Sequence, residues 1–316
     1  MRKMASKTFF AVMLLIVVFF IFLVILLALS TILELTGSSA KELIAINFSS
    51  GSIPNTILSV PIANVSILSG LCSNIVDKAN RITRKIKNPS AEEILSLKPD
   101  VVFIYNWGKA EMVDNLRELG IKVVVVKGPK SIADVKENVK LIAKTLGEED
   151  KGNLMIAKMD DKLAEIKEKL DSIKPEERKK LVLISLMTSY GGKGCTFDDI
   201  CQYAGVINGV SDAGLHNGQL LTKEMLVAIN PDLLIMPVYN DHNTFDIEKY
   251  NKEFLDDPAL QTLNAVKEKR FFYPREGYIY NSSQDIVFGV QEVARAAYGE
   301  LFSQPENCHI SVAEIN

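Results

Sequence analysis

Short, nearly continuous apolar runs alternate with amphipathic segments along most of the chain after residue 41. Apolar runs of this kind are typical of strands that are buried on both faces of a parallel sheet. The pattern predicts strands at Leu43–Asn47, Val101–Tyr105, Lys122–Val126, Leu181–Leu186, Leu233–Pro237 and Arg270–Tyr273. It predicts intervening helices at Ala91–Leu97, Ala110–Leu119 and Thr222–Ile229. Repeated strand–helix alternation indicates an α/β fold.

One long segment interrupts this alternation. Residues 131–173 are rich in helix formers, have apolar positions three and four residues apart, and carry no strand signal. Gly147 and Gly152 are the positions at which such a helix can bend. We interpret the segment as a stiff connecting helix between an N-terminal α/β lobe at 42–130 and a C-terminal α/β lobe at 179–303. Residues 304–316 would form a tail.

A short pattern occurs twice in the chain, once in each predicted lobe. Glu92 stands seven residues before Pro99, and Glu224 stands seven residues before Pro231. Each proline is followed by aspartate and then by an apolar run that ends near a Tyr-Asn pair. Ordinary α/β packing explains the turn, and a helix dipole favours a glutamate in a first turn. Two similar lobes would nevertheless form a pseudo-symmetric pair with a cleft between them.

The N-terminus has a different composition. Residues 1–7 carry Arg2, Lys3 and Lys7, and an uncharged stretch of 21 residues follows from Phe9 to Leu29. A stretch of about 20 apolar residues can cross a bilayer, whereas the apolar region of a cleaved signal usually has about 7–15. We therefore expect a cytoplasmic segment at 1–7, a membrane anchor or signal segment at 8–30 and a tether at 31–41. The basic flank places the remaining chain on the extracytoplasmic side.

Charge and cysteine content exclude some classes of function. Without Arg2, Lys3 and Lys7, 33 basic residues remain against 39 acidic ones, a net charge of −6 that does not favour nucleic-acid binding. Cys195 and Cys201 form the one close pair among the cysteines, and a disulfide between them is possible outside the membrane. Their spacing matches no zinc signature, so no metal site is expected there.

Several stretches taken together resemble a known family, the extracytoplasmic substrate-binding proteins of ABC importers for iron chelates, haem and cobalamin. These stretches are "AEEILSLKPDVVFIYN", "LRELGIKVVVV", "GKGCTFDDICQYAGVIN", "LLTKEMLVAINPDLLIMP" and "SSQDIVFGVQEVARAAYG". The resemblance implies two Rossmann-like α/β lobes connected by a long rigid helix. It also implies an ABC permease dimer with its ATPase subunits as partner, on whose arginines Glu92 and Glu224 would dock. The stretch before Glu92 matches the family less well.

Ligands of open α/β sheets bind beyond the carboxyl ends of the strands, where this chain places several aromatic and cationic residues. Such groups suit a large, planar or chelate-wrapped and anionic ligand. Arg275 is the favoured contact for an anionic group, because a guanidinium offers a planar fork of donors. Imidazole is a common axial ligand of haem iron, although lone loop histidines are usually not ligands; His216 and His242 are the candidates. The predicted ligand-binding residues are Tyr105, Trp107, Tyr190, Lys193, Phe197, Tyr239, His242, Arg275 and Tyr278.

The glycine-rich stretch "SYGGKGCT" lacks the spacing of a phosphate-binding loop, and no hydrolase or zinc-protease motif is present. We therefore expect a binding protein rather than an enzyme, without a resident cofactor. Its transported ligand would be an iron-siderophore-type chelate, haem or cobalamin. A sensor ectodomain on the same fold is the main alternative, and an enzyme with a two-lobe cleft is a weaker one.

Overall fold

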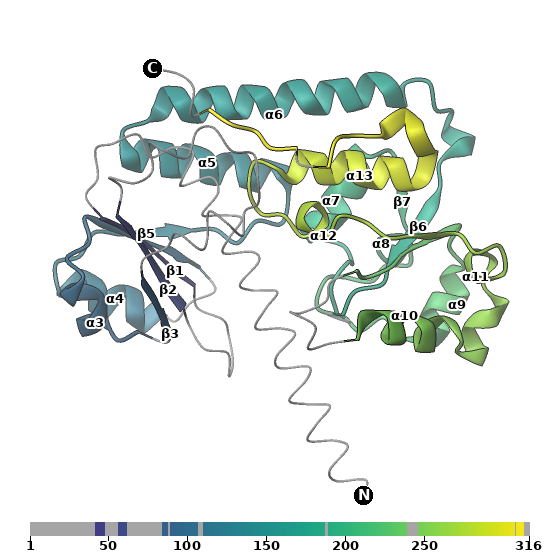
Figure 1. The fold of residues 1–316 in the computed structure, drawn as a ribbon, viewed down its shortest axis with the longest axis horizontal. Coiled ribbons are helices and arrows are strands. Elements are labelled where there is room, and N and C mark those ends of the chain that lie inside the picture. Colours follow the sequence, from purple (N-terminus) through teal and green to yellow (C-terminus); the bar gives the residue numbers. More distant parts are fainter. Residues whose placement is uncertain are drawn as a thin grey trace, which may run out of the picture. The chain divides into compact units, whose positions relative to one another are not determined.

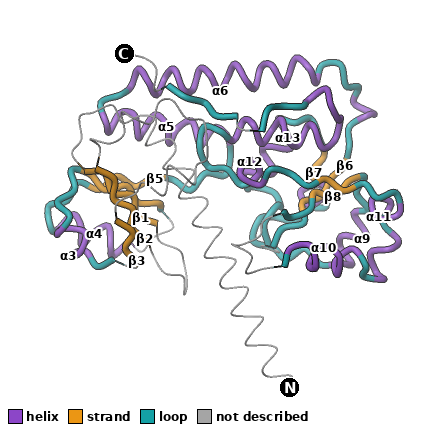
Figure 2. The backbone as a smooth tube through the Cα atoms, viewed as in Figure 1, coloured by secondary structure: helices purple, strands orange, loops and turns teal. Residues whose placement is uncertain are grey.

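The computed structural model describes residues 42–47, 56–61, 84–87, 89–106, 110–186, 189–238, 246–306 and 308–312 (Figures 1 and 2). The chain divides into two compact units, which are considered separately below. Unit 1 contains the residues up to Gly128, Ala133–Lys158 and the residues from His309 onward; unit 2 contains Pro129–Ile132 and Met159–Cys308. The expected segments at 1–7, 8–30 and 31–41 lie outside the described residues. Within the described part of the chain, no helix is long and apolar enough to cross a membrane.

Unit 1 is built on a sheet with the strand order β3-β2-β1-β4-β5. The strands β1, β4 and β5 are parallel, whereas β2 pairs antiparallel with both β1 and β3. The sheet is therefore mixed, and the pattern of apolar runs did not predict β2 or β3. All five residues of β4 are buried, as expected for a strand covered on both faces. The strands are β1 (Glu42–Asn47), β2 (Thr56–Pro61), β3 (Arg84–Lys87), β4 (Val101–Tyr105) and β5 (Val123–Val126).

Two short helices cover one face of this sheet. They are α3 (Ala91–Ser96) and α4 (Ala110–Glu118), close to the predicted bounds. Ile94 of α3 and Leu116 of α4 have no exposed surface and share one apolar cluster with Val102 and Ile104 of β4. In Figure 1, α5 lies on the side of this sheet opposite α3 and α4.

The predicted single helix at 131–173 is two helices in the structure, α5 (Ile132–Leu146) and α6 (Glu149–Leu170). Gly147 ends the first helix, because its φ of 73° is incompatible with a continuous right-handed helix. Gly152 has another function: a Cβ at this position would collide with the Cβ of Ala143, so the glycine permits close packing of α6 on α5. Helix α6 has 22 residues and begins in unit 1 and ends in unit 2.

Unit 2 contains a fully parallel sheet with the order β7-β6-β8-β9. Its strands are β6 (Lys180–Leu183), β7 (Ile207–Asn208), β8 (Leu233–Ile235) and β9 (Phe271–Phe272). Its helices are α7 (Thr196–Tyr203), α8 (Gly209–Asp212), α9 (Lys223–Ile229), α10 (Ile247–Leu255), α11 (Asn264–Lys267), α12 (Glu276–Ile279) and α13 (Ile286–Tyr298), with 3-10 turns at Pro175–Glu177, Pro258–Thr262 and Gly299–Phe302. The first nine residues of α13 are buried, so this helix forms part of the core.

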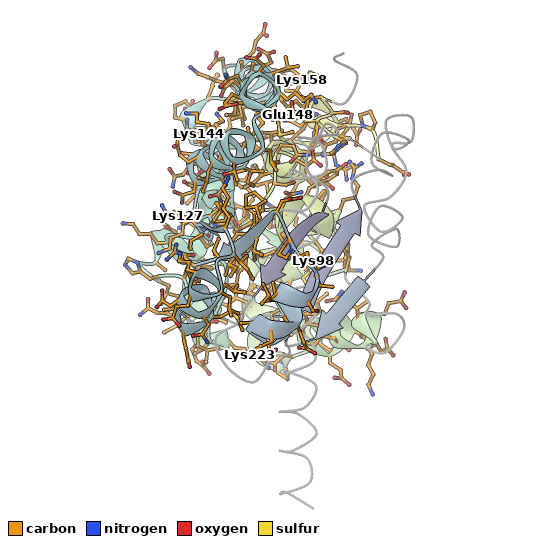
Figure 3. The ribbon with its side chains drawn as sticks, turned by 90° about the vertical axis from the view of Figure 1, so that its left-hand side faces the viewer. Lys98, Lys127, Lys144, Glu148, Lys158 and Lys223 are labelled. Carbon is orange, nitrogen blue, oxygen red and sulfur yellow. The ribbon has the colours of Figure 1, made fainter. Side chains whose placement is uncertain are left out.

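The segment predicted to be a tail packs against the protein. Ile310 and Val312 are buried, with exposed fractions of 6% and 1%. The ammonium of Lys158, which Figure 3 shows on α6, donates to the carbonyl of Ser311 at 2.5 Å. Cys308 is the last residue of unit 2 and His309 begins the final stretch of unit 1, so the chain passes between the units at this point.

The contact of α5 with α6 leads to a first prediction. Gly152→Val should lower the melting temperature by several degrees, because overpacking typically costs about 1–3 kcal/mol, even though valine forms helices more readily than glycine. The matched control is Asn153→Val on the exposed side of the same helix turn, which should melt like the parent protein. Equal melting temperatures of the two variants in a thermal-unfolding scan would contradict the proposed close packing.

Candidate ligand-binding site and docking surface

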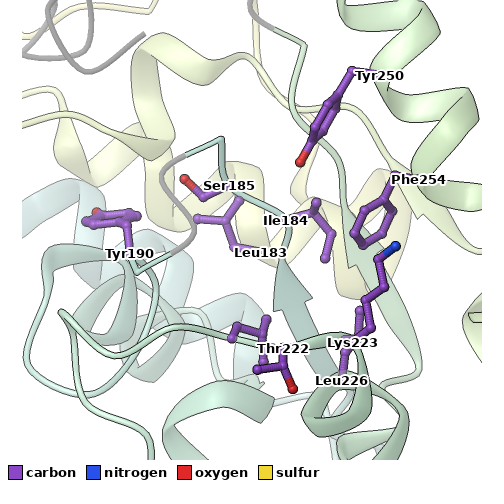
Figure 4. Close-up of a pocket in the computed structure, with 10 residues that line it drawn as sticks. Leu183, Ile184, Ser185, Tyr190, Thr222, Lys223, Leu226, Tyr250 and Phe254 are labelled. Carbon is purple, nitrogen blue, oxygen red and sulfur yellow. The ribbon is translucent and has the colours of Figure 1, made fainter. Parts of the chain in front are cut away.

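A small pocket opens at the carboxyl end of β6, the edge of the sheet at which ligands of α/β proteins bind. Its volume is about 60 Å³, which is well below the roughly 300–1,000 Å³ of sites that enclose a drug-sized ligand. The pocket therefore suits one functional group of a ligand rather than a whole ligand. Ten residues line it (Figure 4): Leu183, Ile184, Ser185, Tyr190, Leu221, Thr222, Lys223, Leu226, Tyr250 and Phe254.

Ser185 and Tyr190 form one wall of this pocket, and each of their hydroxyls is hydrogen-bonded to a neighbouring hydroxyl. The hydroxyls of Tyr190 and Thr196 share a hydrogen bond of 2.8 Å, and the ring of Tyr190 lies 5.4 Å from the ring of Tyr280, centroid to centroid. The hydroxyl of Tyr280 donates to Oγ of Ser185 at 3.2 Å. Burial raises the pKa of Tyr190 well above its usual value, so its hydroxyl stays neutral at physiological pH. The wall thus offers fixed, uncharged polar groups.

The opposite wall combines aromatic rings with one cation. Tyr250 and Phe254 of α10 are stacked, with ring centroids 6.4 Å apart. Burial raises the pKa of Tyr250, and Figure 4 shows its hydroxyl on the side that faces Ile184. The ammonium of Lys223 forms an ion pair with Asp257. Apolar surface with a few convergent polar groups is typical of small-molecule sites.

Sequence reasoning placed Tyr190 in this pocket region but did not name Ser185, Lys223 or Tyr250 as site residues. Ser185 lies two residues beyond the end of β6 but inside the longer strand predicted at Leu181–Leu186, so it was not recognised as a strand-end residue. Tyr250 lies on α10, a helix that the apolar pattern did not predict. Helix α10 follows a long connection, so its side chains could not be assigned to a strand end from the sequence.

Other predicted ligand-binding residues lie elsewhere. Phe197 of α7 has no exposed surface and is a core residue of unit 2. Tyr105 ends β4 in unit 1 with an exposed fraction of 7%, and burial raises its pKa. Lys193 and His216 are exposed and adjacent, because their backbones pair in an isolated parallel bridge outside the strands. Trp107, Tyr239 and His242 lie outside the described residues.

Arg275, the predicted anion contact, is engaged by the protein itself. Its Nη2 donates to the carboxylate of Glu292 at 3.1 Å, and its Nη1 donates to the carbonyl of Pro305 at 2.5 Å. Tyr278, whose pKa burial raises to about 12, donates to the carbonyl of Cys308 at 2.9 Å. Both side chains hold the C-terminal segment, so we do not retain them as ligand contacts.

The candidate disulfide between Cys195 and Cys201 is not formed, and both are free, buried thiols. Cys195 is the N-cap of α7 and Cys201 lies within that helix. Six residues of helix rise about 9 Å, whereas a disulfide requires Cα atoms within about 7 Å. Burial raises the pKa of both thiols, which keeps them protonated. Among the described residues, no group of three His, Cys, Asp or Glu side chains is arranged to hold a metal ion.

The two glutamates predicted to dock occupy equivalent positions. Glu92 lies in the first turn of α3, which Ser90 caps in a capping box with Glu93 as expected. Glu224 lies in the first turn of α9, where the hydroxyl of Thr222 accepts from the N–H of Met225 at 3.2 Å. Both glutamates are exposed. The N–H groups of the helix start and the hydroxyl of the cap residue lower the pKa of each, so both carry a full negative charge at neutral pH.

The repeated sequence pattern is a repeated structure. After each helix, the residue directly before the proline has a positive φ, Lys98 with 50° and Asn230 with 42°. The chain then turns into the buried strand β4 or β8. Because each helix runs back against the strand that follows, its first turn lies toward the carboxyl edge of the sheet. In unit 2 this is also the edge with the pocket, and Thr222 and Lys223 line that pocket next to Glu224.

The comparisons with known proteins agree with this fold. The model of a family described as periplasmic binding protein matches residues 81–276, which is more than half of the 316 residues. The chain therefore belongs to the periplasmic binding protein family, and the resemblance to substrate-binding proteins of ABC importers is confirmed.

Three curated relatives illustrate the range of this family. The ABC transporter substrate-binding lipoprotein YvrC of Bacillus subtilis is 26% identical over 226 residues, which covers 69% of this chain and 68% of YvrC. The iron-uptake system-binding protein of B. subtilis is 25% identical, covering 63% of this chain and 62% of that protein. The molybdate-binding protein MolA of Haemophilus influenzae is 22% identical, covering 69% and 66%. The chain thus spans slightly less than two thirds of the last two relatives.

Solved structures show the same fold. The apo form of the periplasmic heme-binding protein RhuT from Roseiflexus sp. RS-1 superimposes with a TM-score of 0.57 at 21% identity, covering 68% of this chain and 81% of RhuT. CeuE of Helicobacter pylori with bound Ni(II) gives a TM-score of 0.55 at 21% identity, covering 73% and 74%. The names of YvrC and of the iron-uptake system-binding protein are those of binding components of transport systems, which supports the expectation that this chain is not an enzyme.

The free thiols can be tested directly. Trypsin should release a peptide from Gly194 to Lys223 that contains both Cys195 and Cys201. When protein purified without reductant is unfolded and alkylated, we expect this peptide to carry two labels by mass spectrometry. Alkylation before unfolding should leave both unlabelled, because both thiols are buried. An unlabelled peptide lighter by the mass of two hydrogens after unfolding would instead demonstrate the disulfide.

Proposed function

We propose that this protein is the extracytoplasmic substrate-binding component of an ABC importer. The observation that carries the proposal is the helix–turn–strand pattern that occurs once in each unit, with an exposed, ionised glutamate at the same helix position. Packing requires the apolar residues and the turn, but it does not require a glutamate in both first turns. A partner with two-fold symmetry would require a glutamate in each unit, because each half of a permease dimer would meet one unit. ATPase subunits on the other side of the membrane would complete the importer.

The proposed docking surface consists of Glu92 and Glu224 with the helix starts that carry them. Complementary charges at the rim of an interface mainly set orientation and association rate. Arginines on the permease would supply the complementary charge. The lowered pKa values of both glutamates keep these charges in place at neutral and mildly acidic pH.

The proposed ligand is a metal chelate or tetrapyrrole, of the iron-siderophore, haem or cobalamin type. Support comes from the aromatic and neutral hydroxyl groups at the carboxyl edge of the unit 2 sheet, and from relatives whose names give iron or haem as ligand. The names of other relatives give molybdate or nickel, so metal-containing ligands are the common feature. Tyr190 and Tyr250, which line the pocket, would contact such a ligand, together with Trp107, Tyr239 and His242 as predicted from the sequence.

The proposal places this ligand in a cleft between the lobes, on the extracytoplasmic face of the membrane. The segment at 8–30 would act as an anchor or as a cleaved signal. Binding and release would involve no covalent step, which fits the lack of catalytic motifs in the sequence.

Docking predicts a specific effect of neutral, isosteric variants. Glu92→Gln combined with Glu224→Gln should reduce ligand uptake about tenfold or more with the cognate permease in proteoliposomes, because even 1.4 kcal/mol of lost interaction corresponds to a factor of ten. Ligand affinity should remain unchanged, since both side chains point to solvent.

The matched control is Glu111→Gln combined with Glu248→Gln. These glutamates are also exposed and occupy the same first-turn position of α4 and α10, one in each unit. The control pair should transport normally. Equal losses in both pairs would mean that general helix-end charge, rather than docking, explains the defect, and the assignment would then be wrong.

The ligand can be identified by absorbance and by quenching of Trp107, which is the only tryptophan in the chain. The probes are haem, ferric chelates and cobalamin, added separately to the purified protein. Tyr250→Phe removes the hydroxyl at the pocket but keeps the ring, and it should weaken binding of the positive probe about fivefold, the value of one hydrogen bond of about 1 kcal/mol. Tyr203→Phe, at an exposed position of α7, should bind normally. A Tyr250→Phe variant with unchanged affinity would exclude this pocket from the site.

A further inference from the structure

A second pocket of unit 2 lies along α8 and α9, two helices that pack next to each other. We call it the α8–α9 groove. Its volume is about 390 Å³, against about 60 Å³ for the ligand pocket, and the two share no lining residue. Gly209, the first residue of α8, allows the helices to approach, because a Cβ at this position would stand 2.7 Å from Cγ2 of Ile229 in α9. The apolar lining of the groove comes from Ala213, Leu215, Met225, Ala228 and Ile229.

The α8–α9 groove offers apolar surface to the solvent. Met225 is 41% exposed, and Ala213 and Ala228 are exposed as well. The charged lining residues are Lys180, which begins β6, and Asp212, which ends α8. The ammonium of Lys180 lies 2.7 Å from the carboxylate of Asp212, so these two charges neutralise each other. The groove therefore suits an apolar side chain better than a free ion.

The groove borders directly on Glu224. Successive residues of an α-helix are about 100° apart around its axis, so Glu224 lies about 40° from Ala228 and about 100° from Met225. Lys223, which lines the ligand pocket, lies on the other side of Glu224. The exposed Glu224 thus stands on the outer ridge of α9, with the ligand pocket on one flank and the groove on the other.

Unit 1 has different residues at the equivalent positions of α3. Glu93 occupies the place of Met225, and its carboxylate accepts from the N–H of Ser90 in the capping box. Ser96 occupies the place of Ala228. A partner would therefore meet an exposed glutamate in both first turns, but it would meet apolar residues at these two positions only in unit 2.

We propose that the α8–α9 groove is a further contact for the permease and receives an apolar side chain from the half that pairs with Glu224. This inference rests on the proposed function and extends its docking surface. Glu224 and Asp212 bring two negative charges to the groove and Lys180 brings one positive charge, so the net charge of −1 favours a cationic segment. An arginine of that segment would meet Glu224, and an apolar residue about one helical turn away would enter the groove.

The two contacts would contribute differently to binding. An apolar side chain enclosed by a pocket can carry much of the affinity of an interface, whereas charges at the rim mainly set orientation and association rate. The groove would therefore hold the permease, and the two glutamates would orient it.

The salt dependence of permease binding separates these contributions. The dissociation constant of the full chain and the cognate permease in nanodiscs is measured at low salt and in about 1 M NaCl, where the Debye length falls to about 3 Å. Glu92→Gln combined with Glu224→Gln should weaken binding at low salt but approach the parent protein at high salt. Met225→Ser removes apolar surface and should weaken binding about tenfold at both salt concentrations, because salt does not screen apolar burial. Ala228→Phe fills the groove and should have the same effect.

The matched control is Ala164→Phe, which places the same ring at an exposed alanine of α6 in unit 2. It should bind the permease like the parent, and ligand affinity should remain unchanged in all three single variants. If both groove variants bind the permease like this control while the glutamate pair weakens binding, the groove inference is wrong and the proposed function stands. If the parent itself does not bind the permease, both proposals fail. Light scattering tests the other occupant: a dimer of the parent that Met225→Ser dissociates would assign the groove to a second copy and overturn the inference.

Discussion

Each unit depends on one buried central strand that must be covered on both faces. Every residue of β4 and of β8 is buried, so a helix has to pack directly against each strand. The chain meets this requirement with a short helix that reverses through a left-handed residue and a Pro-Asp pair. The reversal fixes the direction of the helix, and the direction places its first turn at the carboxyl edge of the sheet. The positions of Glu92 and Glu224 therefore follow from the need to cover a strand.

The same constraint determines which parts of the fold can be predicted from the sequence. Strands β4 and β8 and helices α3 and α9 are periodic and locally specified, and their predicted bounds agree with the structure to within two residues. Strand β3 cannot be predicted in this way, because it has three basic residues among its four and is defined by pairing with its antiparallel partner β2. The break between α5 and α6 depends on one positive φ at Gly147. A glycine in a helical pattern shows where a break is possible but not whether it occurs.

The candidate site likewise contains some residues whose place could be predicted from the sequence and others whose place could not. The rule that ligands bind beyond strand ends selected Tyr190, which lines the pocket, but it also selected Phe197, which is the second residue of α7 and packs into the core. A loop sequence does not specify which side of the sheet its side chains face. Arg275 was misjudged for a related reason, since its partner Glu292 lies 17 residues further on in a largely apolar helix. A glutamate at a buried position of such a helix requires a cation, and this was the signal that Arg275 serves the fold.

Under the proposed function, a permease would have to distinguish loaded from empty protein. Unit 2 offers a short route from the pocket to one of the proposed docking glutamates: Thr222 and Lys223 line the pocket, and Glu224 is the next residue of the same helix turn. The ammonium of Lys223 already forms an ion pair with Asp257. An anionic ligand group in the pocket would compete with Asp257 for this ammonium and alter the electrostatic field beside Glu224. In unit 1 the corresponding residue is Ala91, which is buried and uncharged, and the two docking sites would therefore respond unequally to the ligand.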